Sequence, residues 1–389
     1  MSEIPRNRKH KIFKTKLRAT WQTLCHWGLI CRYRKTAAHG DKKSALTILK
    51  ELLVMLWRDY AYLTVLEWGI EKYIWDYFVH RVYRKDRSID DYVSDMAGIY
   101  IMCLSSSLSL KRISLLDNKD TFWEFMHKKG FPVTKRFGHL VKKNNQPIVC
   151  LTDGAEATLP DFLRTHKNVF VKPANATKGQ NCALLTYLDD SELQVNQEKM
   201  SYRALADWMN GDLLMEEVVR QHPALSALHA ASLNTLRMVT MRKPDGEIYV
   251  ECAVQRIGTG SRSVDNFSNN GVAVPVNEDG TLTAIGSYKE FSMKDVTAHP
   301  DSHVKFEGYT IPFFKETTEL VLKAHRLNKA INGLGWDIAI TEEGPLFVEA
   351  NPYFDFNILQ TTSRGYRKLL WERYLPAAQK YAVYSDILL

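Results

Sequence analysis

Apolar residues recur at helical spacing through the first third of the chain. The positions between Leu46 and Trp57 predict one helix, and an aromatic-rich stretch from Tyr62 to Phe78 predicts a second. Ser88-Ile89-Asp90-Asp91 resembles a capping box, so a third helix is predicted from there to about Leu110. An aromatic stripe at this spacing is typical of a packed core. We therefore predict a helical region at residues 44–112.

After Arg112 the pattern changes to short apolar runs separated by turn residues. Two pairs of runs flank Lys243-Pro244-Asp245-Gly246 and Asn277-Glu278-Asp279-Gly280, which are strong hairpin signals. The predicted strands are 148–152, 169–171, 183–188, 213–219, 236–242, 247–257, 272–276 and 281–285. The predicted helices are 121–129, 202–209 and 313–331. Most strands are linked as hairpins, so the pattern predicts an α+β fold and not a doubly wound one.

A further hairpin is predicted near the C-terminus, where two alternating apolar runs flank Thr341-Glu342-Glu343-Gly344. Asp337 opens the first strand and Glu349 closes the second, so antiparallel pairing brings both carboxylates to one end of the ribbon. Asn351 lies on the same face if the strand continues. Two carboxylates and an amide form an oxygen-only site suited to Mg²⁺. The alternative is a pair of solvated acids at a sheet rim, followed by an ordinary turn.

The net charge of +8 is concentrated at the start of the chain. Residues 1–43 contain twelve Lys or Arg and two acids, whereas the remainder has 40 basic and 42 acidic residues. Within this arm, residues 6–35 interleave basic and aromatic side chains. One interpretation is a solvated basic helix whose aromatics pack on the next helix. The other is contact of residues 1–35 with an anionic membrane surface. A nucleic-acid partner is not expected, because no basic patch continues into the body.

The remaining composition is that of an ordinary soluble protein, with 45% hydrophobic and 25% charged residues. Six scattered cysteines without a CxxC pair indicate reduced thiols, not a disulfide framework or a zinc site. No signal peptide and no uninterrupted membrane-spanning run are evident. We expect a cytoplasmic protein, with peripheral contact at the inner face of the membrane if the arm binds lipid.

Several basic and acidic residues upstream suit a nucleotide site. Lys119 precedes a predicted helix, and Lys172 ends an apolar strand. The small-residue loop after Lys172 contains Lys178 and Gly179, and its backbone N–H groups can approach phosphate oxygens. Glu216, Glu217 and Val218 lie on a predicted strand whose backbone can bind adenine and whose carboxylates can bind a ribose hydroxyl. Taken singly, each is more often a solvated surface residue.

In this order, over roughly residues 112–362, the set resembles the ATP-grasp superfamily. The resemblance implies two α+β subdomains clasping ATP, with phosphate contacts from Lys119 and Lys172 and a lid at 174–181. It implies a hinge at 215–219 that contacts adenine and ribose. The implied Mg²⁺ ligands are Asp337, Glu349 and Asn351. Similarity to the sugar-transfer-associated ATP-grasp group rests on three further segments: Ser232 to Arg237, Gly335-Trp336-Asp337 and Gln360.

Two departures from relatives stand out. The lid has one glycine, Gly179, where many relatives have several. Ligases for D-alanine dipeptides carry an arginine two residues before the metal-binding aspartate, whereas this chain has Gly335 there. That oxyanion-binding role is therefore not transferred to this chain.

A polar loop is predicted at residues 254–271, and it carries Arg256. This segment is either a surface loop without a binding role or the edge of the cleft that binds the acceptor. Arg237 or Arg256 can bind a substrate carboxylate or acyl phosphate in bidentate fashion, and both are candidate catalytic residues.

The predicted activity is ATP- and Mg²⁺-dependent ligation of a carboxylate to an amine through an acyl phosphate. The resemblance implies small-molecule acid and amine substrates, sugar-linked, in surface polysaccharide biosynthesis. The alternatives are a phosphotransferase acting on a hydroxyl and a non-catalytic ATP-binding scaffold. The predicted organisation is an arm at 1–43, the helical region at 44–112 and an ATP-grasp domain at 113–389 with its lid subdomain at about 165–220. The oligomeric state is left open.

Overall fold

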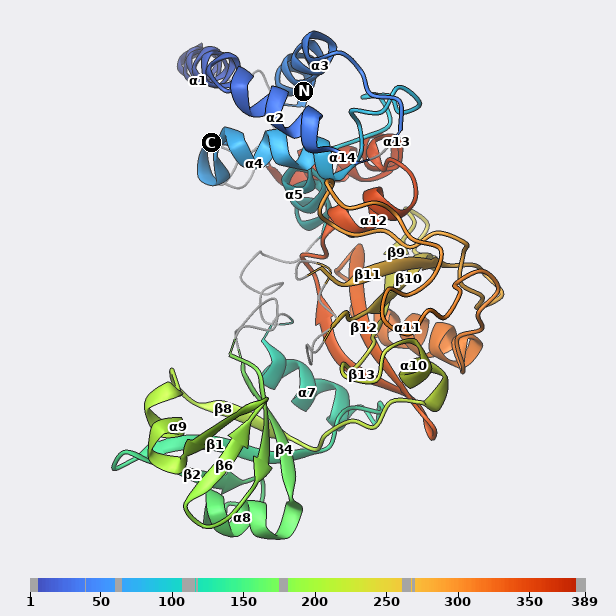
Figure 1. Ribbon diagram of the computed structural model, residues 1–389. Coiled ribbons are helices and arrows are strands. Elements are labelled where there is room, and N and C mark those ends of the chain that lie inside the picture. Colours follow the sequence, from blue (N-terminus) through green and yellow to red (C-terminus); the bar gives the residue numbers. More distant parts are fainter. Residues whose placement is uncertain are drawn as a thin grey trace.

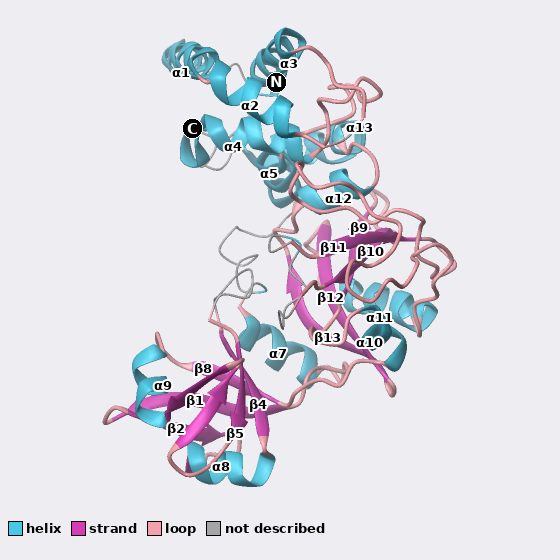
Figure 2. Cartoon of the chain, in the orientation of Figure 1, coloured by secondary structure: helices cyan, strands magenta, loops and turns pink. Residues whose placement is uncertain are grey.

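The computed structural model is an elongated α+β molecule with helices at one end and an eight-stranded sheet at the other (Figure 1). A five-stranded sheet lies between them (Figure 2). The structure describes residues 6–38, 40–59, 65–106, 116, 118–174, 181–260, 267 and 270–382. Every strand pair within the two sheets is antiparallel over this described part, which confirms the predicted fold class.

The chain begins with a helical region that builds its own aromatic core. Its helices are α1 (Arg6–Cys25), α2 (Trp27–Thr36), α3 (Ala45–Asp59), α4 (Val65–Val79) and α5 (Asp95–Ser105). Tyr73, Tyr77 and Phe78 of α4 are buried among residues of α1–α3, which confirms the prediction that the aromatic stripe is core. Ala19 and Ile30 join the same core, so α1 and α2 are packed elements rather than a free arm.

The third predicted helix begins later than the sequence pattern indicated. Ser88 caps only a single turn, in which the Asp91 N–H donates to the Ser88 carbonyl at 3.2 Å. The true N-cap is Ser94, whose hydroxyl accepts a hydrogen bond from the Ala97 N–H at 3.3 Å. The prediction of a start at Ser88 was therefore wrong, because a serine hydroxyl caps a turn as readily as a helix. Helix α5 ends at Ser105, and the predicted end near Leu110 lies outside the described residues.

The eight-stranded sheet has the order β3-β2-β1-β8-β4-β5-β6-β7. Its strands are β1 (Arg136–Lys143), β2 (Gln146–Leu151), β3 (Glu156–Thr158), β4 (Asn168–Pro173), β5 (Ala183–Tyr187), β6 (Glu192–Val195), β7 (Glu198–Ser201) and β8 (Leu213–Glu216). The helices of this part are α7 (Lys119–Lys128), α8 (Leu159–His166) and α9 (Tyr202–Trp208). The expected lid subdomain at about 165–220 takes in β4–β8 of this sheet, and β1–β3 precede it.

The five-stranded sheet has the order β11-β10-β9-β12-β13. Its elements are α10 (Pro223–Leu228), β9 (Leu236–Arg242), β10 (Ile248–Ile257), β11 (Val272–Val276), α11 (Phe314–Leu327), β12 (Gly333–Thr341) and β13 (Gly344–Asn351). The β9–β10 and β12–β13 hairpins are confirmed. The predicted strand at 281–285 was wrong: this segment makes only isolated bridges, such as Leu282 with Val276 and Thr281 with Thr310.

The C-terminal elements join the helical region to this sheet. They are α12 (Phe356–Thr362), α13 (Arg367–Leu369), the π-helical turn η3 (Leu370–Tyr374) and α14 (Leu375–Ala382). Gln360 of α12 is buried, and its side-chain amide donates to the Val93 carbonyl at 2.7 Å. Its Oε1 accepts from the Val93 N–H at 3.2 Å. These contacts fix the start of α5 to α12. None of the described helices combines the length and apolar character that a bilayer crossing needs.

Candidate active site

The three predicted metal ligands converge on the β12–β13 hairpin. Asp337 pairs with Glu349, and Gly335 pairs with Asn351. Strand β13 therefore continues to Asn351, which was the condition for placing Asn351 on the same face as Glu349. The two carboxylates are register partners close enough to influence each other's pKa, and the Asn351 amide donates to Glu349 Oε1 at 3.3 Å. Asp337 lies in the middle of β12 rather than opening it, because four residues from Gly333 onward already pair with β9.

Two arginines on neighbouring strands bind Asp337. Arg237 is its register partner on β9 and donates from Nε and, at 3.0 Å, from Nη2. Arg256 Nη1 donates to Asp337 Oδ2 at 2.9 Å. Arg256 lies on β10, opposite Ala273 of β11, so its predicted placement in a polar loop was wrong. The alternating apolar pattern ends before Arg256, but backbone pairing carries the strand on to Ile257.

The charges of this cluster are closely balanced. Burial raises the pKa of Asp337, but Arg237 and Arg256 outweigh it and hold that pKa below its ordinary value. Burial and the neighbouring Asp337 charge raise the pKa of Glu349. The hairpin therefore carries one firmly ionised carboxylate beside one whose ionisation a cation would favour.

Lys119 brings a third cation to the hairpin from the start of α7. The Asn118 side chain caps this helix by accepting from the N–H groups of Asp120 and Thr121 at 3.0 Å. The Lys119 N–H donates to the Ala174 carbonyl at 3.0 Å, which fixes α7 to the end of β4. Lys119 Nζ lies 3.3 Å from Glu349 Oε2. Lys119 thus lies where the two sheets meet.

The eight-stranded sheet contributes a second charged cluster. Lys172 Nζ lies 2.7 Å from Glu216 Oε2, and both side chains are buried. Arg136 of β1 lies 3.5 Å from Glu216 Oε1, binds Asp120 and donates to the Lys119 carbonyl at 3.3 Å. The sequence analysis missed Arg136. The only indication of Arg136 in the sequence is the alternation of buried and less buried positions along β1. No motif contains this residue.

The charges of both clusters act on the thiol of Cys182, which lies just before β5. The pKa of the Cys182 thiol is raised by burial and modulated by the charges of Lys119, Lys172, Glu349 and Glu216. A single side chain therefore senses groups from both sheets. In Figure 1, α7 lies between the sheets at this junction. The structure brings together the predicted phosphate-binding lysines and the predicted metal ligands.

The remaining candidate residues lie at the connection between the sheets or outside the described residues. Glu217 and Val218 follow β8 in the segment that leads to α10. The Glu217 N–H donates to the Lys135 carbonyl at 2.8 Å, and its exposed carboxylate lies 3.4 Å from Lys135 Nζ. Val218 is partly buried. Lys178 and Gly179 lie outside the described residues.

The residues present fit a hard divalent cation. Two paired carboxylates and an adjacent amide offer oxygen ligands of the kind that Mg²⁺ prefers, and their number leaves positions for water and phosphate. Over the described residues, no group of three His, Cys, Asp or Glu suited to holding a metal is found.

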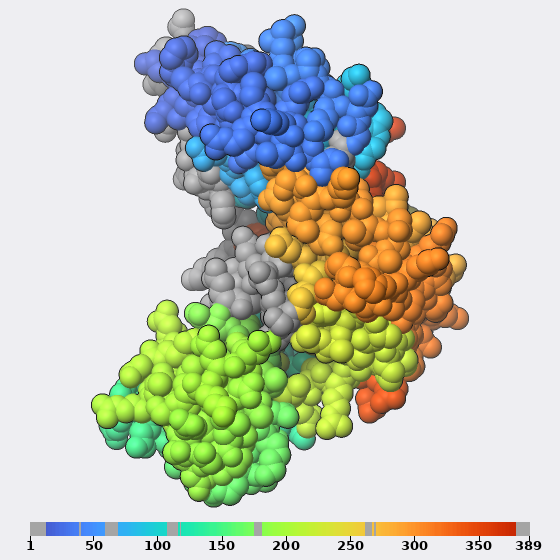
Figure 3. Space-filling model, viewed as in Figure 1, coloured from blue at the N-terminus to red at the C-terminus, as the bar shows by residue number. Residues whose placement is uncertain are grey.

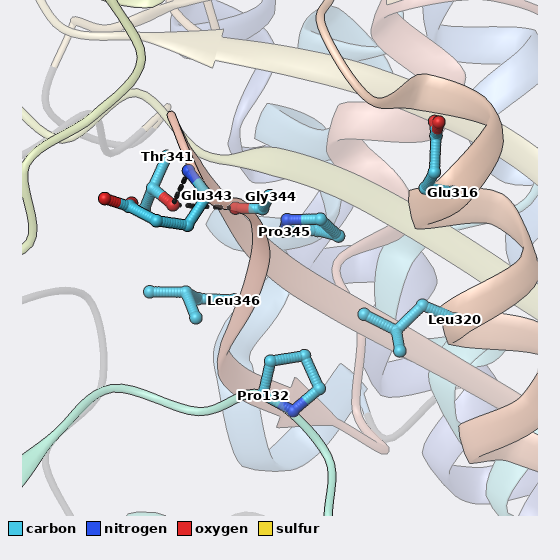
Figure 4. Close-up of a pocket in the computed structure, with 8 residues that line it drawn as sticks. All are labelled: Pro132, Glu316, Leu320, Thr341, Glu343, Gly344, Pro345 and Leu346. Carbon is cyan, nitrogen blue, oxygen red and sulfur yellow. Dashed lines mark hydrogen bonds between the residues drawn. The ribbon is translucent and has the colours of Figure 1, made fainter.

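A shallow pocket of about 380 Å³ lies at the other end of the same hairpin (Figure 4). Its charged residues are Glu316 and Glu343. Figure 4 shows the turn residues Thr341 to Gly344 on one side of it and α11 on the other. Asp337 is four residues from Thr341, roughly 13 Å along a strand. The pocket is therefore separate from the charged cluster.

Comparison with known proteins identifies one family. The profile of a family described as sugar-transfer associated ATP-grasp matches residues 108–370. No curated protein matches the chain.

Solved structures with some similarity include three enzymes. One is N5-carboxyaminoimidazole ribonucleotide synthetase from Thermotoga maritima, with 14% identity over 62% of this chain and 43% of that chain, at a TM-score of 0.32. Another is D-alanine-D-alanine ligase from Coxiella burnetii, with 9% identity over 71% and 61%, at 0.38. The third is the biotin carboxylase domain of Hydrogenobacter thermophilus 2-oxoglutarate carboxylase with MgADP, with 13% identity over 64% and 46%, at 0.36. This chain thus spans about half the length of several of these proteins.

Proposed function

Because this chain belongs to the sugar-transfer-associated ATP-grasp family, we propose that it is an ATP-dependent ligase that joins a carboxylate to an amine. The observation that carries the proposal is the pairing of Asp337 with Glu349 next to Asn351, beside the Lys119 ammonium. A second lysine, Lys172, lies across the junction. This arrangement suits a polyphosphate with its divalent cation.

The nucleotide would bind between the two sheets. Lys119 and Lys172 would each exchange a carboxylate partner, Glu349 or Glu216, for phosphate oxygens. The peptide groups from Glu216 to Val218 would meet adenine, and a carboxylate there would meet the ribose. Lys178 and Gly179 would cover the phosphates from the loop after β4. Their backbone and charge suit that role, since small-residue loops allow close approach of N–H groups to phosphate.

Asp337, Glu349 and Asn351 would hold Mg²⁺, which supplies charge neutralisation at the transferring phosphate. The ionised Asp337 is held between Arg237 and Arg256, so it is positioned before any ligand binds. Glu349 already contacts Lys119 at 3.3 Å. The hairpin would therefore align the metal and the lysine against the same phosphate group, which is the main contribution a protein makes to phosphoryl transfer.

Arg237 and Arg256 would hold the anionic substrate. A guanidinium has five N–H donors, and Arg237 directs Nε and Nη2 to Asp337. The pair therefore carries two positive charges against one aspartate, with donor capacity for a second anion. The substrate carboxylate would attack the γ-phosphorus of ATP, forming an acyl phosphate and ADP. An amine would then displace inorganic phosphate and form an amide.

The family description supports sugar-linked acid or amine substrates in the assembly of a surface polysaccharide. We place the reaction in the cytoplasm, where ATP is available. All six cysteines are free thiols, which agrees with a reducing compartment. No feature of the described residues favours a nucleic-acid partner.

Hydroxylamine trapping separates a ligase from a phosphotransferase. With ATP, Mg²⁺ and the correct acid, the ligase should yield a hydroxamate, because hydroxylamine captures the acyl phosphate. A phosphotransferase would instead yield a phosphoester that resists hydroxylamine, and that product would refute the ligase. Candidate sugar acids and amino acids can be tested in pools, with ADP release as the first readout.

Arg256→Lys tests how the acid is held. The lysine keeps a positive charge near Asp337 but loses the planar fork that binds a carboxylate. Hydroxamate formation should fall at least tenfold while Mg-ATP affinity changes little. Arg364→Lys is the matched control, since Arg364 is an exposed arginine paired with Glu251. Equal activity of Arg256→Lys and wild type would remove Arg256 from the acid site.

A further inference from the structure

One face of α1 is apolar and exposed to solvent. Phe13, Leu17, Trp21 and Leu24 are each between 41% and 68% exposed. Their spacing of four, four and three residues places them in one stripe along the helix. An exposed stripe of this size on a folded helix indicates a contact surface, because single exposed apolar residues are common but aligned ones are not.

The stripe continues onto α3. Trp57 of α3 is 38% exposed, and its ring centroid lies 6.2 Å from that of Phe13 in an edge contact. Trp57 Nε1 donates to Thr20 Oγ1 at 2.9 Å. Lys16 Nζ lies 5.4 Å from the Trp57 ring centroid and donates to the Trp57 carbonyl at 3.0 Å. Two helices therefore present one continuous surface, called the α1–α3 face below.

The opposite side of α1 is fixed in the core of the helical region. Ala19 and Thr23 are fully buried, and the Thr23 hydroxyl donates to the Ala19 carbonyl at 2.8 Å. The stripe cannot turn inward without exposing these residues. The aromatics predicted to pack on the next helix do so only in part: Phe13 contacts Trp57, whereas Trp21 is 68% exposed.

The charge of α1 is of one sign. Its sequence, RNRKHKIFKTKLRATWQTLC, contains seven Lys or Arg residues and no acid. Lys14 and Arg18 are exposed next to the apolar stripe. A surface that combines an apolar stripe, tryptophan and flanking basic residues is complementary to the headgroup region of an anionic bilayer.

We propose that the α1–α3 face docks this protein on the surface of an anionic lipid bilayer, with α1 lying in the plane of the headgroups. The apolar stripe would enter the boundary between headgroups and acyl chains, and Lys14 and Arg18 would contact lipid phosphates. A nucleic acid would use the basic groups but leave Phe13, Leu17 and Trp21 in water. The bilayer satisfies both parts of the surface.

The position of the face leaves the active site open. Figure 1 shows α1 at the end of the molecule opposite the eight-stranded sheet, and Figure 3 shows the N-terminal helices in blue at that end. A membrane-docked molecule would thus hold its nucleotide site away from the bilayer by the length of the five-stranded sheet. Docking and nucleotide binding are independent in this arrangement, so the proposal does not rest on the ligase activity.

Vesicle flotation of the full-length protein tests the proposal. Vesicles of phosphatidylcholine with 30% phosphatidylglycerol should bind the protein at low salt, and pure phosphatidylcholine vesicles should bind it at least tenfold less. Leu17→Ser with Trp21→Ser should reduce binding to the anionic vesicles at least tenfold. Lys14→Glu with Arg18→Glu should do the same and should weaken the salt dependence, since five other basic residues of α1 remain.

Matched controls come from the eight-stranded sheet. Trp208→Ser removes an exposed tryptophan of α9, and Lys199→Glu with Arg203→Glu reverses two exposed charges there. Both should bind vesicles like wild type. Unchanged melting temperatures of the α1 variants would exclude misfolding, since all four positions are exposed. Failure of wild type to float with anionic vesicles at low salt, or equal losses in the controls, would overturn the proposal. Binding of an acidic protein without vesicle binding would overturn it as well.

Discussion

At the scale of single residues, Glu349 is the side chain that best separates a metal ligand from a structural acid. It is partly exposed and lies 3.3 Å from Lys119 Nζ, so replacing it breaks a single ion pair at the edge of the cluster. Asp337 is less suitable for this purpose. Its loss would leave two buried guanidinium groups without their counterion, which typically costs several kcal/mol of stability.

Glu349→Gln should abolish turnover and weaken Mg²⁺-dependent nucleotide binding at least tenfold, while the melting temperature changes by only a few degrees. The physical reason is the loss of one anionic oxygen ligand next to Asp337. Calorimetric titration with ATP in the presence and absence of Mg²⁺ measures the effect. Glu343→Gln is the control, because Glu343 is an exposed glutamate in the turn of the same hairpin. Wild-type Mg²⁺ dependence in Glu349→Gln would contradict the ligand assignment.

Lys172→Gln should lower Mg-ATP affinity about tenfold or more, or about 1.4 kcal/mol, because an ammonium that meets phosphate is removed. It should also lower the melting temperature, since Lys172 and Glu216 form a buried pair at 2.7 Å. Binding is therefore measured well below the transition. Lys167→Gln, at an exposed lysine just before β4, should change neither quantity. An unchanged affinity in Lys172→Gln would exclude a phosphate contact.

A site residue could be predicted from the sequence only where a local sequence pattern marked it. Asp337, Glu349 and Asn351 could be placed together because two alternating runs and a turn fix the register of a hairpin. Arg256 fell both in the predicted strand 247–257 and in the predicted polar loop 254–271, because the Gly- and Ser-rich segment begins only two residues after it. Arg136 could not be found at all. Its contacts with Glu216 and Asp120 join residues 80 and 16 positions away, and no local motif encodes such pairings.

At the scale of elements, the packing of α11 on the five-stranded sheet contains a hydrogen-bonded histidine. Trp336 Nε1 donates to Thr240 Oγ1 at 2.8 Å, and the Thr240 hydroxyl donates to His325 Nδ1 at 2.7 Å. His325 Nε2 donates to the Ile331 carbonyl at 3.0 Å. These contacts fit the neutral imidazole, in which Nδ1 accepts and Nε2 donates. Burial accordingly lowers the pKa of His325 to about 4.

The buried, hydrogen-bonded His325 should make the stability of the protein depend on pH. In the unfolded protein the histidine pKa is about 6.5, so the unfolded state binds more protons between pH 6.5 and about 4. The free energy of unfolding should therefore fall as the pH is lowered through this window, by up to about 1.4 kcal/mol per pH unit from this group. Urea unfolding of His325→Gln should show a shallower fall than wild type. His127→Gln, at an exposed histidine, should not; equal slopes for all three proteins would contradict the assignment.

The predicted boundaries of helices and strands agree with the structure where the sequence contains one clear cap or turn. They disagree where it offers more than one. The start of α7 at Asn118–Lys119 agrees within two residues with the expected helix. The start of α5 was misplaced by seven residues, because Ser88 and Ser94 both offer a hydroxyl and only the tertiary contact of Val93 with Gln360 selects the second. The segment 281–285 has strand-like residues and lies beside β11, but it makes only isolated bridges there and with Thr310.

At the scale of the whole molecule, the helical region and the five-stranded sheet share a core. Ala97 and Ile101 of α5 are buried in one cluster with Val239 of β9 and Phe356 of α12. His80 Nε2 donates to Asn357 Oδ1 at 2.8 Å across the same junction. Polar and apolar contacts between residues more than 250 positions apart thus hold the helices to the sheet. The shared core leads us to expect that the helical region and the five-stranded sheet unfold together, although the composition changes near residue 112.

A substitution at Gly98 tests whether the helical region and the five-stranded sheet unfold together. It lies on α5, and a Cβ at this position would come within 2.8 Å of the Phe356 ring. Gly98→Ala should therefore lower the free energy of unfolding by about 1–3 kcal/mol through overpacking, although alanine favours a helix. Gly28→Ala is the matched control, since nothing lies within 4 Å of its Cβ on α2, and it should be neutral or stabilising by up to about 1 kcal/mol.

The decisive measurement is whether both halves of the molecule respond together to Gly98→Ala. Helix content by far-UV circular dichroism and protection of the β12–β13 amides by hydrogen exchange should be lost at the same, lowered urea concentration. The reason is that α5 cannot separate from α12 without exposing the buried cluster that also supports β9, the strand that pairs with β12. Loss of helix content with an unchanged β12–β13 transition would instead show that the helical region unfolds independently and that the nucleotide site stands without it.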